Sequence, residues 1–101
     1  MSVDDLDAVL VPPKRLAALG LVAAATKVDF AFIRDELGLS DSDLSKQLKA
    51  LTDAGYITTE KVGRGLTRKT WVSITDNGAS ALDAHAQALL ALVRPDAARP
   101  V

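Results

Sequence analysis

The feature that most constrains the fold is a pair of helices separated by almost nothing, which the sequence marks with capping residues. Asp29 is a favourable N-cap, and Gly38 stands where a left-handed residue ends a helix. These two signals predict a first helix over residues 30–37. A single leucine then separates Gly38 from Ser40, which is another favourable N-cap. The connection between the two helices is therefore a tight turn.

The second of these helices is longer and amphipathic. Its leucines recur at i, i+4 and i+7, at Leu44, Leu48 and Leu51, and Gly55 marks its end. A short helix, a glycine-containing turn and a longer amphipathic helix are typical of a helix-turn-helix. We therefore predict this motif over residues 29–55.

The segment before the motif predicts one more core helix. Residues 1–25 divide into a short helical or extended arm and a helix from Lys14 to Ala25, which follows Pro12-Pro13. Proline suits the first turn of a helix, and the alanines and leucines of this stretch favour helical packing.

After the motif the hydrophobic period changes. Residues 56–75 contain two runs rich in β-branched and aromatic side chains, 56–59 and 70–74, around Gly63-Arg64-Gly65. They predict a hairpin with a long basic tip. Residues 76–93 predict a last helix, capped by Thr75 or Asp76 and stopped by Pro95, with residues 97–101 as a frayed tail.

Composition narrows the class of protein. The chain has 101 residues, which favours one domain, a formal net charge of −1 and no cysteine. Its only histidine is His85, so little is available for acid–base or metal chemistry. No apolar run reaches the ~18 residues of a membrane span, and no cationic leader precedes an apolar segment. We expect a cytoplasmic protein without a cofactor, not an enzyme and without a membrane partner.

The ordered set of motifs resembles one family. It resembles the short single-domain winged-helix regulators related to the MarR and ArsR groups, over roughly residues 6–90. The resemblance rests on Pro13-Lys14-Arg15-Leu16, Asp29-Phe30, Leu37-Gly38-Leu39-Ser40, Leu44-Ser45-Lys46-Gln47-Leu48-Lys49-Ala50-Leu51, Ala54-Gly55-Tyr56-Ile57, the Gly/Arg hairpin, and Ile74-Thr75 with Gly78. It implies a mainly α fold with a small β-hairpin (α+β), a winged helix-turn-helix over residues 1–101.

The resemblance also implies a function: a sequence-specific transcriptional regulator that binds double-stranded promoter DNA. The second helix of the motif would enter the major groove, and the hairpin would touch backbone or minor groove. The expected recognition-helix contacts are Ser42, Ser45, Lys46, Gln47 and Lys49. The expected wing contacts are Lys61, Arg64, Arg68 and Lys69, since long cationic side chains neutralise phosphates without reading sequence.

Other interpretations of the same residues stay open. The lysines of the second helix can be ordinary solvated side chains, and the hairpin cations can simply keep an edge strand soluble. Asp41 and Asp43 open the recognition helix, where they favour the helix dipole but would repel DNA. A winged-helix protein-interaction adaptor without DNA binding is the alternative function.

The last helix predicts a homodimer. Residues 86–93 contain Gln87 as their single polar residue, so the stretch is apolar almost all round. The expected interface residues are Leu82, His85, Ala86, Leu89, Leu90, Leu92 and Val93. Two-fold symmetry would predict a pseudo-palindromic operator with half-sites about one DNA turn apart. The alternative is a helix packed within its own domain.

Asp83-Ala84-His85 invites a metal site, which we do not expect. Some ArsR-like zinc sensors carry such a pair on their last helix, but the matching downstream positions here fall near Asp96 and Arg99. One histidine with one or two carboxylates is a poor zinc site. A small-molecule effector could bind between the recognition and dimer helices, and nothing in the sequence identifies it, the operator, the regulated genes or the sign of regulation.

Overall fold

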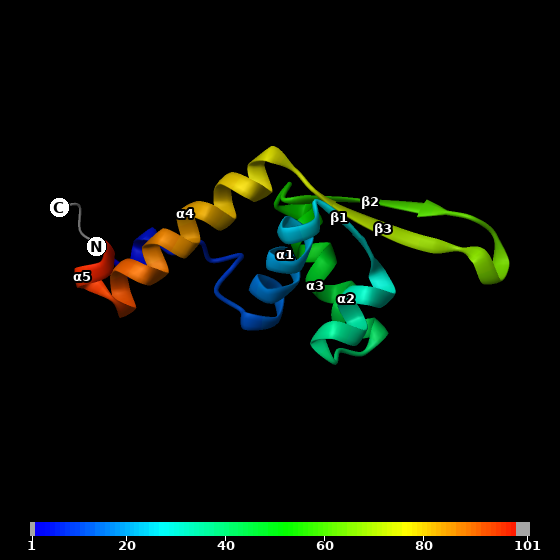
Figure 1. Cartoon of the computed structure of the whole chain (residues 1–101), viewed down its shortest axis with the longest axis horizontal. Coiled ribbons are helices and arrows are strands. Elements are labelled where there is room, and N and C mark those ends of the chain that lie inside the picture. Colours follow the sequence, from blue (N-terminus) through cyan, green and yellow to red (C-terminus); the bar gives the residue numbers. More distant parts are fainter. Residues whose placement is uncertain (1, 99–101) are drawn as a thin grey trace.

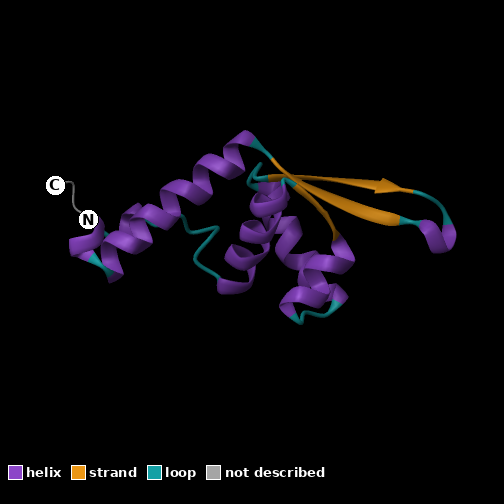
Figure 2. Cartoon of the chain, viewed as in Figure 1, coloured by secondary structure: helices purple, strands orange, loops and turns teal. Residues whose placement is uncertain are grey.

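A computed structural model describes residues 2–98 of the chain (Figure 1). The chain is mainly helical and has one long β-hairpin (Figure 2). The helices are η1 (Val3–Asp5), α1 (Pro13–Ala25), α2 (Phe30–Leu37), α3 (Asp41–Asp53), η2 (Gly65–Thr67), α4 (Asp76–Val93) and α5 (Pro95–Ala98). The strands are β1 (Lys27–Asp29), β2 (Ile57–Val62) and β3 (Lys69–Ile74).

The helix boundaries follow the capping residues that the sequence displays. The side chain of Asp29 accepts a hydrogen bond from the Phe32 amide, and Gly38 ends α2 in the left-handed region at φ +65°. The side chain of Ser40 accepts from the Asp43 amide and so starts α3. The predictions of α2 and of the tight turn are confirmed, because local hydrogen bonds decide both ends.

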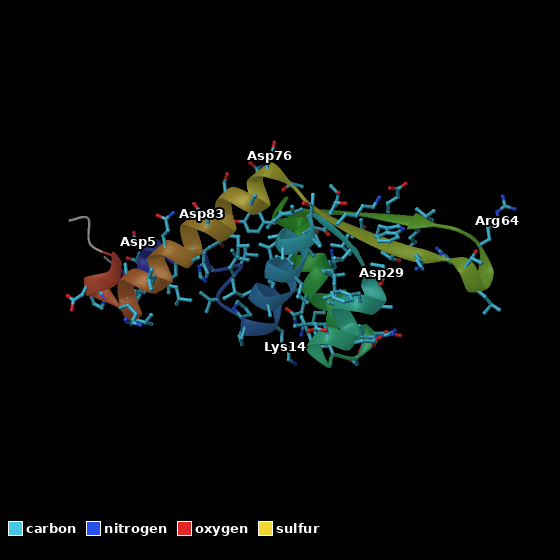
Figure 3. The ribbon with its side chains drawn as sticks, in the orientation of Figure 1. Asp5, Lys14, Asp29, Arg64, Asp76 and Asp83 are labelled. Atoms are coloured by element: carbon cyan, nitrogen blue, oxygen red, sulfur yellow. The ribbon has the colours of Figure 1, made fainter. Side chains whose placement is uncertain are left out.

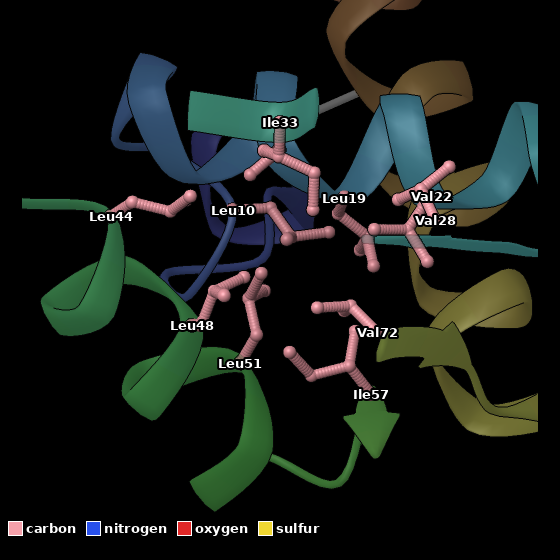
Figure 4. Close-up of a cluster of buried hydrophobic side chains, with 11 residues drawn as sticks. Leu10, Leu19, Val22, Val28, Ile33, Leu44, Leu48, Leu51, Ile57 and Val72 are labelled. Carbon is pink, nitrogen blue, oxygen red and sulfur yellow. The ribbon is translucent and has the colours of Figure 1, made fainter. Parts of the chain in front are cut away.

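One hydrophobic core holds α1, α2, α3 and the sheet together (Figure 4). The three leucines of the predicted amphipathic stripe are all buried, Leu44 and Leu51 completely. The arm also contributes: Leu10, just before α1, is 0% exposed. The rest of the fully buried large side chains are Leu19, Val22, Ile33, Ile57 and Val72.

The sheet has three strands, in the order β1-β3-β2, and both pairs are antiparallel. The hairpin of β2 and β3 was predicted, although both strands extend further toward the tip than the β-branched runs. The strand β1 is not predicted by the sequence. Its central residue Val28 pairs with Val72, which is distant in the sequence, and three residues are too few to show an alternating pattern.

The last predicted helix is confirmed over residues 76–93, and a short helix that was not predicted follows it. Thr75 caps α4 through a hydrogen bond from the Gly78 amide. As predicted, α4 ends at Val93, before Pro95. Pro95 then begins the short helix α5, because proline is favourable in a first helical turn. Residues 97 and 98, which were expected to be frayed, belong to this helix. Of the predicted frayed tail, residues 99–101 lie outside the described part of the chain.

The molecule is elongated, because two elements project from the helical body in opposite directions (Figure 1). The hairpin extends to one side and the second half of α4 to the other, and the extents are 54 × 24 × 21 Å. The arrangement is a winged helix-turn-helix, with α2 and α3 as the motif and β2–β3 as the wing. No helix among residues 2–98 has the length and apolar character needed to cross a membrane.

Candidate nucleic-acid interface

One face of α3 is free for a partner. The opposite face packs into the core through its leucines, so the helical period of 3.6 residues leaves a polar stripe outside. Four of the five α3 residues that are expected to contact DNA lie on this stripe and are exposed: Ser42, Ser45, Lys46 and Lys49. The stripe continues over the exposed residues Thr52 and Asp53.

Gln47, the fifth, does not lie on that stripe. It is only 8% exposed, and its side chain joins two other helix residues. Its Oε1 accepts a hydrogen bond of 3.2 Å from Arg15 Nε, and its Nε2 donates to Asp43 Oδ1 over 3.0 Å. Because its polar atoms are already satisfied between α1 and α3, we remove Gln47 from the expected contacts and assign it a packing role.

The two acids at the start of α3 are both paired with cations of other helices. Arg34 Nη1 of α2 lies 2.9 Å from Asp41 Oδ1, and Lys14 Nζ of α1 lies 2.6 Å from Asp43 Oδ2. The hydrogen bond from Lys14, with a second from Gln47, lowers the pKa of Asp43 below its usual value. Their negative charges are therefore compensated within the protein, which reduces the expected repulsion of DNA.

Lys49 has a carboxylate partner of its own. Its Nζ lies 3.1 Å from Asp53 Oδ2, one helical turn away, and both side chains are largely exposed. Exposed pairs of this kind contribute only a few tenths of a kcal/mol. A DNA phosphate can replace such a partner at little cost. Lys46, in contrast, has no ion pair with any residue that the structure describes.

The outer part of the wing is basic, since residues 61–69 contain four cations and no acid. Figure 3 shows Arg64 at the far end of the hairpin. Lys61, Arg64 and Arg68 are exposed and form no ion pair within residues 2–98. Lys69 is less available, because its Nζ lies 3.7 Å from Asp29 Oδ2 and 5.7 Å from the centre of the Trp71 ring. Three of the four expected wing cations thus have no ion-pair partner among the described residues.

A groove joins the recognition helix to the wing. It has a volume of about 560 Å³, and α3 lines it with Ser45 and Lys49 while the wing contributes Lys61. A second hollow, of about 320 Å³, lies between the start of α2 and the far end of the wing. Phe30 and Thr70 line both, so the two hollows are neighbours. Neither hollow is lined by α4, where an effector cleft was expected.

The residues expected at a dimer interface fall into two groups. Leu89, Leu90 and Val93 are 36%, 42% and 65% exposed, Ala86 is also exposed, and Leu92 is half-buried. Leu82 instead packs partly against the core of its own domain. The first half of α4 therefore completes the core, and the second half presents apolar side chains outward.

His85 is the clearest departure from the expected interface. It is 2% exposed, and its Nδ1 accepts a 3.0 Å hydrogen bond from the backbone amide of Asp7 in the arm. The carboxylate of Asp7 accepts a hydrogen bond from the Tyr56 hydroxyl, which together with burial raises the pKa of Tyr56 to about 12. The expectation of an interface or surface residue was wrong, because the arm folds back and covers this histidine.

Neither part of the Asp83-Ala84-His85 motif belongs to a metal cluster. Asp83 accepts a 3.0 Å hydrogen bond from Gln87 Nε2, and His85 is engaged by the arm. Among residues 2–98 no group of three or more histidine, aspartate or glutamate side chains could hold a metal ion.

The chain is similar to known winged-helix proteins in sequence and in structure. A family described as "Winged helix DNA-binding domain" matches residues 14–93. The transcriptional regulator homologue of Pyrococcus horikoshii is 26% identical, has a TM-score of 0.80, and is matched over 86% of each chain. No curated protein matches the chain.

Two further solved structures show the same fold at lower identity. Reduced AbfR bound to DNA is 21% identical with a TM-score of 0.72, and the match covers 85% of this chain and 62% of that one. The zinc-responsive MarR family member ZitR of Lactococcus lactis is 23% identical with a TM-score of 0.60, over 73% and 50%. The resemblance to MarR-related regulators is confirmed.

Proposed function

The chain belongs to the winged helix DNA-binding domain family, and from this premise we propose that it regulates transcription as a homodimer that reads a specific sequence in promoter DNA. Membership makes it a DNA-binding regulator and not an enzyme. Because the proposed partner is promoter DNA, we also propose that the protein is cytoplasmic. The finer points, which are the reading residues and the dimer, follow from the geometry of α3, the wing and α4.

The observation that carries the proposal is the groove in which α3 and the wing meet. Ser45 and Lys49 of the helix and Lys61 of the wing line the same hollow, so one duplex could touch both elements at once. The competing acids of the helix start are paired to Arg34 and Lys14. This surface is therefore less repulsive to a polyanion than the net charge of −1 indicates.

We assign base reading to the exposed stripe of α3. Ser42, Ser45 and Lys46 lie near the start of the helix, which is the end that reaches base edges in helix-turn-helix proteins. Lys46 forms no ion pair with a described residue, and a lysine in the major groove pairs with guanine. Replacing it should change which sequence is bound.

We assign phosphate binding to Lys49 and to the cations of the wing. Lys61, Arg64 and Arg68 stand exposed along an element without an acid from residue 61 to residue 75. Each phosphate contact releases counterions, so the affinity should fall steeply with salt. Removing Arg64 or Arg68 should weaken all sequences about equally and reduce the salt slope by about 1.

The second half of α4 is the proposed dimer surface. Leu89 and Val93 recur one helical turn apart, and Val3 of the arm, 69% exposed, adds to the apolar surface of this part of the molecule. Contiguous apolar surface on a small protein marks an interaction site, and a second copy is the commonest partner of such a face. Ala86, Leu90 and Leu92 complete the proposed set.

The decisive experiment is selection of bound sequences from a random duplex library at two salt concentrations. A pseudo-palindrome whose recovery weakens with salt supports a sequence-specific dimer. Folded protein that recovers nothing above background would contradict the proposal and favour an adaptor role. Lys46→Ala should shift the recovered sequence and Arg64→Ala should not, so identical behaviour of the two variants would refute the division between reading and holding residues.

A further inference from the structure

One apolar side chain stands fully exposed at the far end of the wing. Leu66 is 106% exposed and lies in η2, the single helical turn that closes the hairpin. Exposed leucines on a broad surface are ordinary. Leu66 is different, because it lies in the closing turn of the wing, between Arg64 and Arg68, which form no ion pair with a described residue.

The fold fixes the position of this side chain. Thr67 Oγ1 donates a 2.8 Å hydrogen bond to the Arg64 carbonyl and accepts one of 3.3 Å from the Arg64 amide. Gly63 closes the other side of the turn at φ +91°, where a Cβ would lie 2.4 Å from the Thr67 carbonyl oxygen. The tip is a tight, hydrogen-bonded turn that presents Leu66.

Leu66 also lines a hollow that lies next to the proposed DNA-binding surface. With Arg68 it lines the 320 Å³ hollow, and α2 contributes Phe30 and Arg34 to the same hollow. Because Phe30 and Thr70 line the groove of α3 as well, the hollow that Leu66 lines is next to that groove. A duplex seated against α3 would therefore extend toward the tip.

We propose that Leu66 enters the DNA minor groove as an apolar wedge, an inference that rests on the proposed function. The grooves of a duplex alternate, so an element that projects past a helix in the major groove crosses a phosphate backbone and meets the neighbouring minor groove. Arg64 and Arg68 neutralise the phosphates on the way. Leu66 then contacts sugars and base edges, and favours base steps that deform easily.

This role differs measurably from that of the arginines beside it. An apolar contact releases no counterion, so removing it changes the affinity without changing the salt slope. It also depends on the deformability of the DNA, so its loss removes sequence preference in the flanks of the operator. Removing Arg64 has the opposite signature, because the salt slope falls and the flanking preference stays.

The test uses the full chain and the duplex recovered by library selection, with Leu66→Ala, Arg64→Ala and a control. Val62→Ala is the matched control, because Val62 is also an exposed apolar wing residue, at 45%, but lies at the end of β2 and not at the tip. We expect Leu66→Ala to bind roughly three- to tenfold more weakly at every salt concentration. Repeated selection with this variant should lose the flanking preference, and Val62→Ala should behave as the wild type.

Thermal unfolding separates this effect from a folding defect, since Leu66 packs against nothing that its loss would destabilise. A variant with wild-type affinity and wild-type flanking preference would overturn the inference and leave the proposed function intact. A reduced salt slope in Leu66→Ala would also overturn it, because the effect would then be electrostatic. If the wild type itself binds no duplex, both the proposed function and the wedge fall together.

Discussion

Replacing Gly78 with alanine should destabilise the protein, because there is no space for a methyl group at this position. The glycine lies in the first turn of α4 and is buried against the start of the wing. A Cβ built there would lie 2.1 Å from the Tyr56 carbonyl oxygen, where real Cβ atoms do not come closer than about 3.0 Å. Since that oxygen also accepts a 3.0 Å hydrogen bond from the Thr75 amide, the added methyl must displace the junction between β2 and α4.

The cost of Gly78→Ala can be estimated from these contacts. Overpacking against backbone that cannot rotate away costs about 1–3 kcal/mol, and the strained Thr75–Tyr56 hydrogen bond adds about 1 kcal/mol. The better helix propensity of alanine returns up to about 1 kcal/mol. The net expectation is a loss of roughly 1–4 kcal/mol, which corresponds to a fall in Tm of about 5–30 °C for a domain of this size.

Gly20 supplies the matched control. It lies inside α1, and a Cβ there would meet nothing within 4 Å. Gly20→Ala should therefore stabilise the protein by about 0.5–1 kcal/mol, because alanine restricts the unfolded chain and favours the helix. Both variants are compared by urea and thermal unfolding at one protein concentration, since the proposed dimerisation would make Tm concentration-dependent.

A Gly78→Ala protein that is as stable as the wild type would refute the steric role of Gly78. Such a result would mean that the wing and α4 can move apart without loss, so that Gly78 is not needed for the close approach. Destabilisation by Gly20→Ala would refute the second prediction, because the direction of the stability change would then not follow from the space around the new methyl group.

The remaining predictions concern single contacts. Tyr56 is the only tyrosine, so absorbance at 295 nm titrates it alone: we expect a midpoint of about 12, and a lower one in Asp7→Asn. Since the pKa of Tyr56 is raised in the folded protein, the stabilisation by its hydrogen bond to Asp7 is complete below pH 10 and is lost as the pH rises through 12. An unaltered titration of Tyr56 in Asp7→Asn would exclude Asp7 as the cause of the raised pKa. Leu89→Asp should yield monomers by sedimentation equilibrium, and an intact dimer would remove α4 from the interface. Ser40→Ala should cost α3 its cap and about 1 kcal/mol in urea unfolding, whereas an unchanged midpoint would mean that the Asp43 amide finds another acceptor.

The elements that local chemistry determines could be predicted from the sequence. Asp29, Gly38 and Ser40 satisfy backbone groups within a few residues of themselves, so their roles are visible without tertiary information. The strand β1 has no such local signal. Val28 becomes a strand residue only because β3 passes beside it.

The errors at the candidate site have the same origin. Gln47 is polar, but its partner Arg15 lies on another helix and takes it out of the solvent-facing stripe. His85 looked available because the sequence does not show that the arm returns to cover it. The ion pairs of Asp41 and Asp43 also span separate helices, so the sequence showed the charges but not their neutralisation.

The elongated shape bears on how the assembly of this protein is measured. The Cα radius of gyration is 14.9 Å, whereas a compact chain of this length would have about 13 Å. An elongated monomer diffuses more slowly than a sphere of equal mass, so its elution from a gel-filtration column would imitate a larger species. Small-angle scattering resolves the two cases, since a dimer doubles the forward intensity and an extended monomer does not.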